Sequence, residues 1–244
     1  MPLCSRLFGC LLVVLFCSSC HKSKLGPCTG NCQVVQFAGV VVDPGAQKPL
    51  AGSSVTVYMP RRQSCTLCGS YQVISGKTKA DGTFDLTTTV DTTLVVPHSC
   101  TISVQAPANY IAYAVPVGPG IGPDAFSGTL AWPLPVDSAG VAPYEEFDFY
   151  QPILLTVQLH RTGGIVSSAP ALSLSFSMAT GSSSLWGLNE SSTNADTTLT
   201  LYTGANVFTW INAIQFVTDS TVQNQTDSIR CVVGGNNTIE ITYL

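Results

Sequence analysis

The sequence predicts an all-β protein built from two β-sandwich domains. Only 10% of its 244 residues are charged, whereas an average soluble domain has about 25%. In place of charged residues the chain has many Thr, Ser, Val and Gly residues, which are common in strands and turns. Short apolar segments with period-two alternation recur along the chain, separated by Gly, Pro and Asn. After the N-terminal region, no ten-residue segment shows the 3.6-residue period of an amphipathic helix.

The first domain is expected over residues 33–116. Residues 33–43 read QVVQFAGVVVD and are rich in β-branched side chains, while residues 54–59 alternate as SVTVYM. Ala80-Asp81-Gly82 is a turn signal, because glycine readily takes the positive φ of a tight turn. Strands are predicted over residues 33–43, 54–59, 71–78, 83–90, 92–96, 101–106 and 110–115.

Three segments of this block resemble the carboxypeptidase regulatory-like domain: FAGVVVD at 37–43, KPLAGSSVTV at 48–57 and TKADGTF at 78–84. The resemblance implies a transthyretin-like β-sandwich of about seven strands, in which Gly52 and Gly82 shape turns. It implies no catalytic residue, because the family's motifs are structural. It also implies a core that includes Val40, Val55, Val57 and Phe84.

Residues 117–143 are predicted to be a Pro/Gly-rich linker, because runs such as Trp132-Pro133-Leu134-Pro135 cannot form central strands. A second, immunoglobulin-like β-sandwich is expected over residues 144–244, where short strands alternate with Gly-, Asn- and Ser-rich turns. Trp210 lies inside an apolar strand and is expected in the core. The strands of this domain are predicted over residues 153–160, 171–178, 197–202, 208–217, 227–233 and 237–243.

The N-terminus reads as an export signal. Residues 7–16, LFGCLLVVLF, are uncharged, and their length suits a signal peptide but falls short of the about 20 residues that span a bilayer. Cys17-Ser18-Ser19-Cys20 resembles the lipobox of bacterial lipoproteins, with Cys17 where leucine is usual. The resemblance implies removal of a signal peptide, residues 1–19, a lipid on Cys20 that anchors the protein in the outer membrane on either face, and a tether over residues 20–32. An ordinary secretory signal is the alternative.

The cysteines after Cys20 are predicted to form disulfides, because they are even in number and the compartment is oxidising. The spacing suggests bonds between the N-terminal segment and the 65–68 loop. Two alternatives stay open: four thiolates could hold zinc, or the Cys-x-x-Cys at 65–68 could be a redox pair, although no helix starts there. The cysteines concerned are Cys28, Cys32, Cys65, Cys68, Cys100 and Cys231.

The residues give little support for other classes of function. A net charge of −4 without a basic stripe argues against nucleic-acid binding. His21, His98 and His160 are scattered, and neither an H-E-x-x-H zinc motif nor a G-x-S-x-G nucleophile elbow is present. The acidic run EEFD at 145–148 resembles a strand entry more than a calcium loop. We therefore expect no catalytic residue, no metal and no cofactor.

The sequence thus predicts a non-catalytic, lipid-anchored envelope protein with a binding or structural role, whose partner is an envelope protein or a glycan. The alternative is an accessory protein that captures polysaccharide. Trp132 and Trp186 are predicted to lie in loops, where flat aromatic rings can stack on sugars. An envelope enzyme is the third and least favoured hypothesis.

Overall fold

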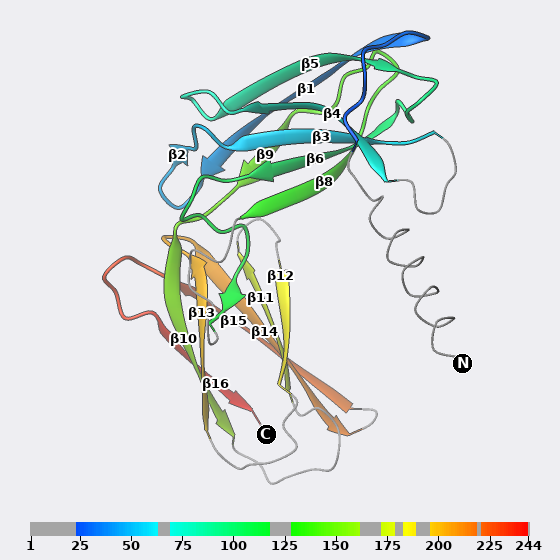
Figure 1. The fold of residues 1–244 in the computed structure, drawn as a ribbon. Helices are drawn as coiled ribbons and strands as arrows, with labels where there is room; N and C mark the ends of the chain where they lie inside the picture. The colour runs from blue at the N-terminus through cyan, green and yellow to red at the C-terminus, as the bar shows by residue number, and fades with distance from the viewer. Residues whose placement is uncertain are drawn as a thin grey trace, which may run out of the picture.

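The computed structural model describes residues 23–62, 69–117, 128–161, 172–178, 183–188, 196–218 and 221–243. Over these residues the chain forms strands, turns and loops but no helix. The strands assemble into four sheets, which pair into two β-sandwiches joined end to end (Figure 1). The predicted all-β class with two sandwiches is confirmed.

The first sandwich consists of two sheets with a shared apolar core. One sheet has the order β4-β3-β6-β8, formed by Ser70–Lys77, Ser54–Pro60, Ser99–Gln105 and Thr129–Pro135. In the other sheet, β1 (Cys32–Asp43) pairs antiparallel with β2 (Lys48–Pro49) and β5 (Thr83–Asp91), and parallel with β9 (Glu145–Asp148). Alternate side chains of each strand turn inward, as in β3, where Val55, Val57 and Met59 are fully buried.

The three segments that resemble the regulatory-like domain meet in this sandwich. Gly52 and Gly82 have φ angles of 77° and 75°, as predicted for turns. A Cβ on Gly82 would lie 2.6 Å from the carbonyl oxygen of Val41, so the hairpin requires glycine there. Val55, Val57 and Phe84 are buried as predicted. The prediction for Val40 is wrong: it lies on the outer side of β1, because Phe37 and Val41 occupy the inward positions.

The second sandwich has the same two-layer construction. Its sheets have the orders β16-β10-β13-β7 and β12-β11-β14-β15. The strands are β7 (Val115–Pro116), β10 (Pro152–Arg161), β11 (Leu172–Met178), β12 (Ser183–Leu188), β13 (Thr197–Gly204), β14 (Phe208–Thr218), β15 (Thr221–Arg230) and β16 (Thr238–Tyr243). Their inward side chains, among them Leu155, Val157, Leu174, Phe176 and Ile211, form a second core.

The chain crosses between the sandwiches more often than the sequence predicts. β7 pairs with β13 of the second sandwich, although it lies within the segment predicted for the first domain. β8 returns to pair with β6, and β9 then pairs with β1 before the chain enters β10. The predicted linker at 117–143 is therefore wrong in part, since it contains β8. Pro133 and Pro135 are tolerated because β8 is an edge strand, where a missing N–H removes no ladder bond.

A small apolar cluster lies where the two sandwiches meet. Ile111 and Tyr150 are buried there and pack with Met178 and Val207 from the second sandwich. The turn after β1 also touches the second sandwich, because a Cβ on Gly45 would lie 2.0 Å from the carbonyl oxygen of Ala205. We call this contact region the junction.

The N-terminal tether attaches at the other end of the first sandwich. The N–H of Leu25 donates to the carbonyl of Gln72, and the N–H of Gln72 donates to the carbonyl of Ser23, both at 3.0 Å. Gln72 lies opposite Tyr58, near the end of β3 that is remote from the junction. Asp43 ends β1 at the junction, so the tether and the second sandwich lie at opposite ends of the first sandwich (Figure 1).

Candidate binding surfaces

Two aromatic side chains lie side by side on the outer face of β14. Phe208 and Trp210 are 47% and 38% exposed, while Thr209 and Ile211 between and beside them are buried. The ring centroids of Phe208 and Trp210 are 6.0 Å apart and the ring planes are tilted by 36°. The alternation of β14 thus places large apolar side chains on both faces of its sheet.

Small uncharged side chains surround these rings. By register, Trp210 lies between Ser177 of β11 and Ser228 of β15, and Asn212 lies between Ser175 and Thr226. The hydroxyl of Thr226 donates to the amide oxygen of Asn212 at 3.4 Å. We call this surface the aromatic face; it comprises Ser173, Ser175, Ser177, Phe208, Trp210, Asn212, Asn224, Thr226 and Ser228.

Charge is sparse beside the aromatic face. Arg230 lies opposite Phe208 on β15. Its Nε donates to the carbonyl of Asn206 at 3.2 Å, which holds the guanidinium against the β13–β14 turn. The rings are therefore bordered mainly by hydroxyl and amide groups, with Arg230 as the one described cation beside Phe208.

The sequence prediction for Trp210 is wrong, because Trp210 is exposed rather than buried in the core. The segment FTWINAI has apolar residues at both odd and even positions, so its pattern does not reveal which set turns inward. Ile211 and Ala213 fill the core, and Phe208 and Trp210 face outward.

The two tryptophans predicted as ligand-stacking residues lie on strands rather than in loops. Trp132 is in the middle of β8, opposite Ile102, and is 47% exposed at the edge of the first sandwich. Trp186 lies in β12, where its register partner is Leu174 of β11. The structure places them in different sandwiches, so they do not form one site. Their role in binding sugars remains a prediction.

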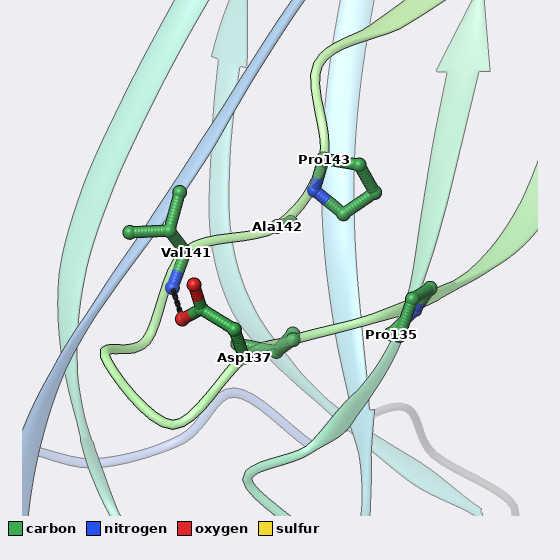
Figure 2. Close-up of a pocket in the computed structure, with 6 residues that line it drawn as sticks. Pro135, Asp137, Val141, Ala142 and Pro143 are labelled. Atoms are coloured by element: carbon green, nitrogen blue, oxygen red, sulfur yellow. Dashed lines mark hydrogen bonds between the residues drawn. The ribbon is translucent and has the colours of Figure 1, made fainter.

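A hollow near the tether end of the first sandwich is lined by one acid and five apolar residues (Figure 2). It lies between the end of β8 and the segment that leads to β9. The Oδ1 atom of Asp137 accepts a hydrogen bond from the N–H of Val141 at 2.8 Å, so this carboxylate closes a turn. The one acidic side chain of the lining therefore has a structural role in this turn. Its lining residues are Pro135, Val136, Asp137, Val141, Ala142 and Pro143.

Acidic side chains gather near the junction. Burial, together with the nearby Glu146 and Asp43, raises the pKa of Asp148 to about 6. The Oδ1 atom of Asp148 is buried without a hydrogen-bond partner. Burial also raises the pKa of Asp43. Its Oδ1 accepts hydrogen bonds from the N–H groups of Gly45 and Ala46, which lower the pKa but do not cancel the effect of burial. In the described part of the chain, no three His, Cys, Asp or Glu residues are grouped to hold a metal ion.

The histidines that the structure describes lie apart. His160 at the end of β10 pairs with Asp196, with Nδ1 and Oδ2 3.2 Å apart, and both side chains are well exposed. His98 precedes β6 in the first sandwich, and His21 lies outside the described residues. The structure therefore does not bring His98 and His160 together.

Within the described residues, no helix is long and apolar enough to cross a membrane.

The cysteine predictions need correction. Cys28 and Cys32 are bonded to each other, so the expected bond from this segment to the 65–68 loop is wrong, and neither residue has a thiolate for zinc. Cys100 and Cys231 are free, because each fills a position in the core of a different sandwich and they cannot meet. Burial raises the pKa of both thiols to about 11. Cys20, Cys65 and Cys68 lie outside the described residues.

No protein-family model matches this chain, and no curated protein sequence does. Among solved structures, the chain is similar to the Bacillus anthracis TIE protein, at 12% identity and a TM-score of 0.31, over 86% of this chain and 34% of that protein. The shaft pilin SpaA of Lactobacillus rhamnosus GG gives 10% identity and a TM-score of 0.28, over 87% and 97% of the two chains. A putative cell adhesion protein of Bacteroides ovatus gives 9% identity and 0.27, over 87% and 92%. The chain spans about a third of the length of the Bacillus anthracis protein.

Proposed function

We propose that this protein is a non-catalytic, lipid-anchored envelope protein that holds a binding domain away from the membrane. The observation that carries the proposal is that the tether and the second sandwich contact opposite ends of the first sandwich. The tether contacts it at Gln72, and the second sandwich contacts it at the opposite end, through the turn at Gly45 and through Tyr150.

A lipid on Cys20 would hold the tether end of the first sandwich near the bilayer, because Cys20 precedes Ser23, whose carbonyl accepts a hydrogen bond from the N–H of Gln72, by three residues. Two or more acyl chains give stable anchoring, whereas one chain alone binds reversibly. β1 runs the length of this sandwich with 12 residues, which corresponds to about 40 Å of extended strand. The first sandwich then acts as a spacer of that length, and the second sandwich is the membrane-distal domain.

The junction supports the spacer role, because it joins the sandwiches by more than a single linker. The chain passes between them before β7, again before β8 and again before β10. Buried side chains from both sandwiches pack together there, including Tyr150 and Met178. A flexible linker would let the second sandwich fall back to the membrane, whereas packed contacts hold it outward.

The test is fractionation of cells that express the full chain in a Gram-negative host. We expect the wild type in the membrane fraction, released by detergent but not by high salt. Cys20→Ser should abolish this behaviour, and Cys4→Ser, which lies outside the apolar run and the Cys17–Cys20 motif, is the matched control that should keep it. Equal membrane retention of Cys20→Ser and wild type would overturn the proposed anchor.

Polysaccharide capture is a second candidate function, favoured by exposed aromatic side chains in both sandwiches. Trp132 is single and lies at the edge of the spacer, whereas Phe208 and Trp210 are paired on the domain proposed to be distal. The location and surroundings of the pair make it the stronger of the two sites.

A further inference from the structure

We infer that the aromatic face of the second sandwich binds a neutral polysaccharide chain, with the rings of Trp210 and Phe208 stacked on sugar rings. The inference deepens the proposed function, since it assigns a ligand class to the domain proposed to be membrane-distal. Stacking on the apolar face of a sugar is favourable for a broad, exposed ring, and bordering polar groups can bind the sugar hydroxyls.

The rings are presented as a pair rather than as isolated surface residues. Phe208 and Trp210 are two positions apart on β14 and share one face of the sheet. Their centroid separation of 6.0 Å is comparable to the length of one sugar unit, so successive units of a polymer could each meet a ring. The sheet holds β14 on both sides, through β11 and β15, so the backbone beneath the rings is fixed before a ligand arrives.

The side chains beside Trp210 on the two neighbouring strands are short, so they do not cover its ring. Ser177 and Ser228 lie on either side of Trp210, and serine carries a hydroxyl that both donates and accepts. Asn212 and Thr226 continue this polar border along the strands and are already hydrogen-bonded to each other. A flat aromatic surface edged by hydroxyl and amide groups matches a sugar, which has apolar faces and a rim of hydroxyls.

Electrostatics favour a neutral ligand. The described side chains on this side of β11, β14 and β15 carry one charge, that of Arg230 opposite Phe208, whose Nε donates to the carbonyl of Asn206. A polyanion would require several cationic groups to neutralise its charge. A protein partner typically covers a wider apolar centre than two rings. The charge of the surface therefore complements a neutral polysaccharide better than either of these.

The test measures retention of the purified full chain on insoluble polysaccharides, with cellulose, chitin, starch and yeast β-glucan as neutral probes and de-esterified pectin as a charged one. We expect saturable retention on at least one neutral polymer. Trp210→Ala should weaken that affinity at least tenfold, which corresponds to about 1.4 kcal/mol of binding free energy. Phe208→Ala should weaken it in the same direction, and Trp210→Tyr should restore most of it.

Tyr144→Ala is the matched control, because it removes an exposed aromatic side chain that belongs to neither candidate site. Trp132→Ala tests the alternative site on β8. Both variants should leave retention unchanged. Circular dichroism spectra that match the wild type would show that the variants fold, and Asn212→Ala offers a milder change on the same face. Lack of retention on every neutral polymer, or equal loss from Trp132→Ala and Trp210→Ala, would overturn the inference. Cell fractionation does not depend on sugar binding, so it tests the proposed lipid anchor separately.

Discussion

Ile111 and Tyr150 exchange two backbone hydrogen bonds, the N–H of Ile111 donating to the carbonyl of Tyr150 at 2.9 Å and the N–H of Tyr150 donating back at 2.8 Å. The two residues belong to separate crossings between the sandwiches. Their pairing binds these crossings into a short two-stranded connection with buried side chains. The relative placement of the two sandwiches therefore depends on ordinary core packing, which mutation can test.

Truncation of Tyr150 should destabilise the protein strongly. Its side chain is fully buried at the junction, and replacing a large buried ring by alanine costs about 3–5 kcal/mol. Chemical denaturation followed by circular dichroism would measure the free energy of unfolding of Tyr150→Ala. Tyr144→Ala is the control, because Tyr144 is 63% exposed and should change stability by less than about 0.5 kcal/mol. Similar losses from both variants would contradict the buried junction.

A methyl group at Gly45 should strain the contact between the sandwiches. The added Cβ would approach the carbonyl oxygen of Ala205 to 2.0 Å, so the β1–β2 turn or the second sandwich must shift. We expect Gly45→Ala to lower the free energy of unfolding by about 1–3 kcal/mol. Gly26→Ala has open space around it and should be neutral. A neutral Gly45→Ala would show that the turn does not press on Ala205.

The stability of the junction should depend on whether the carboxyl group of Asp148 is protonated. Its pKa of about 6 exceeds its ordinary value of 3.8 because burial disfavours the charged form. The folded state therefore holds this proton more tightly, and the contribution of Asp148 to stability falls as pH rises through 6. At pH 7 we expect Asp148→Asn to be more stable than the wild type by roughly 1–2 kcal/mol, a discounted value because the side chain is only partly buried.

The difference between Asp148→Asn and wild type should shrink towards zero as the pH falls from 7 to below 3.8, where Asp148 is protonated in both the folded and the unfolded wild type. Asp81→Asn provides a control of opposite sign. Hydrogen bonds from the hydroxyl and N–H of Thr83 lower the pKa of Asp81, so its carboxylate stabilises the fold above its unfolded pKa and loses this effect in acid. Denaturation at several pH values measures both, and a pH-independent Asp148→Asn difference would contradict the buried carboxyl.

The free thiols should be protected by the fold. Cys100 and Cys231 are 1% and 0% exposed, and their pKa of about 11 leaves little reactive thiolate at pH 7. We expect maleimide to label them only after denaturation, as read by mass spectrometry of the peptides. The Cys28–Cys32 peptides should require reduction instead. Rapid labelling of Cys100 in the native protein would contradict its place in the core.

Strands with clear alternation were predictable from the sequence to within a residue or two. The segment 54–59 becomes β3, Ser54–Pro60, and 33–43 becomes β1, Cys32–Asp43. In β3, inward valines and outward polar residues report the two faces that the sheet imposes. β1 has valines on both faces, so the side on which Val40 lies could not be judged from the pattern. The positive φ of Gly82 followed likewise from local turn chemistry.

Elements that exist because of distant partners were not predictable in this way. β8 is rich in proline, and the first part of β15 is polar on both faces, so neither shows a strand pattern. They form because β6 and β14 offer edges to pair with. The segment 92–96 was predicted as a strand but forms only an isolated bridge at Val95. Likewise, the exposure of Trp210 depends on which face of β14 meets the second core.

The fluorescence of Trp210 reports directly on whether the outer face of β14 is the binding surface. Trp132→Phe combined with Trp186→Phe leaves Trp210 as the only one of the chain's three tryptophans. Titration should use soluble oligosaccharides of the neutral polymer that retains the wild type. We predict a saturable shift of the Trp210 emission, with an affinity that matches inhibition of retention. Unchanged emission while the oligosaccharide still blocks retention would place the site elsewhere and contradict the account.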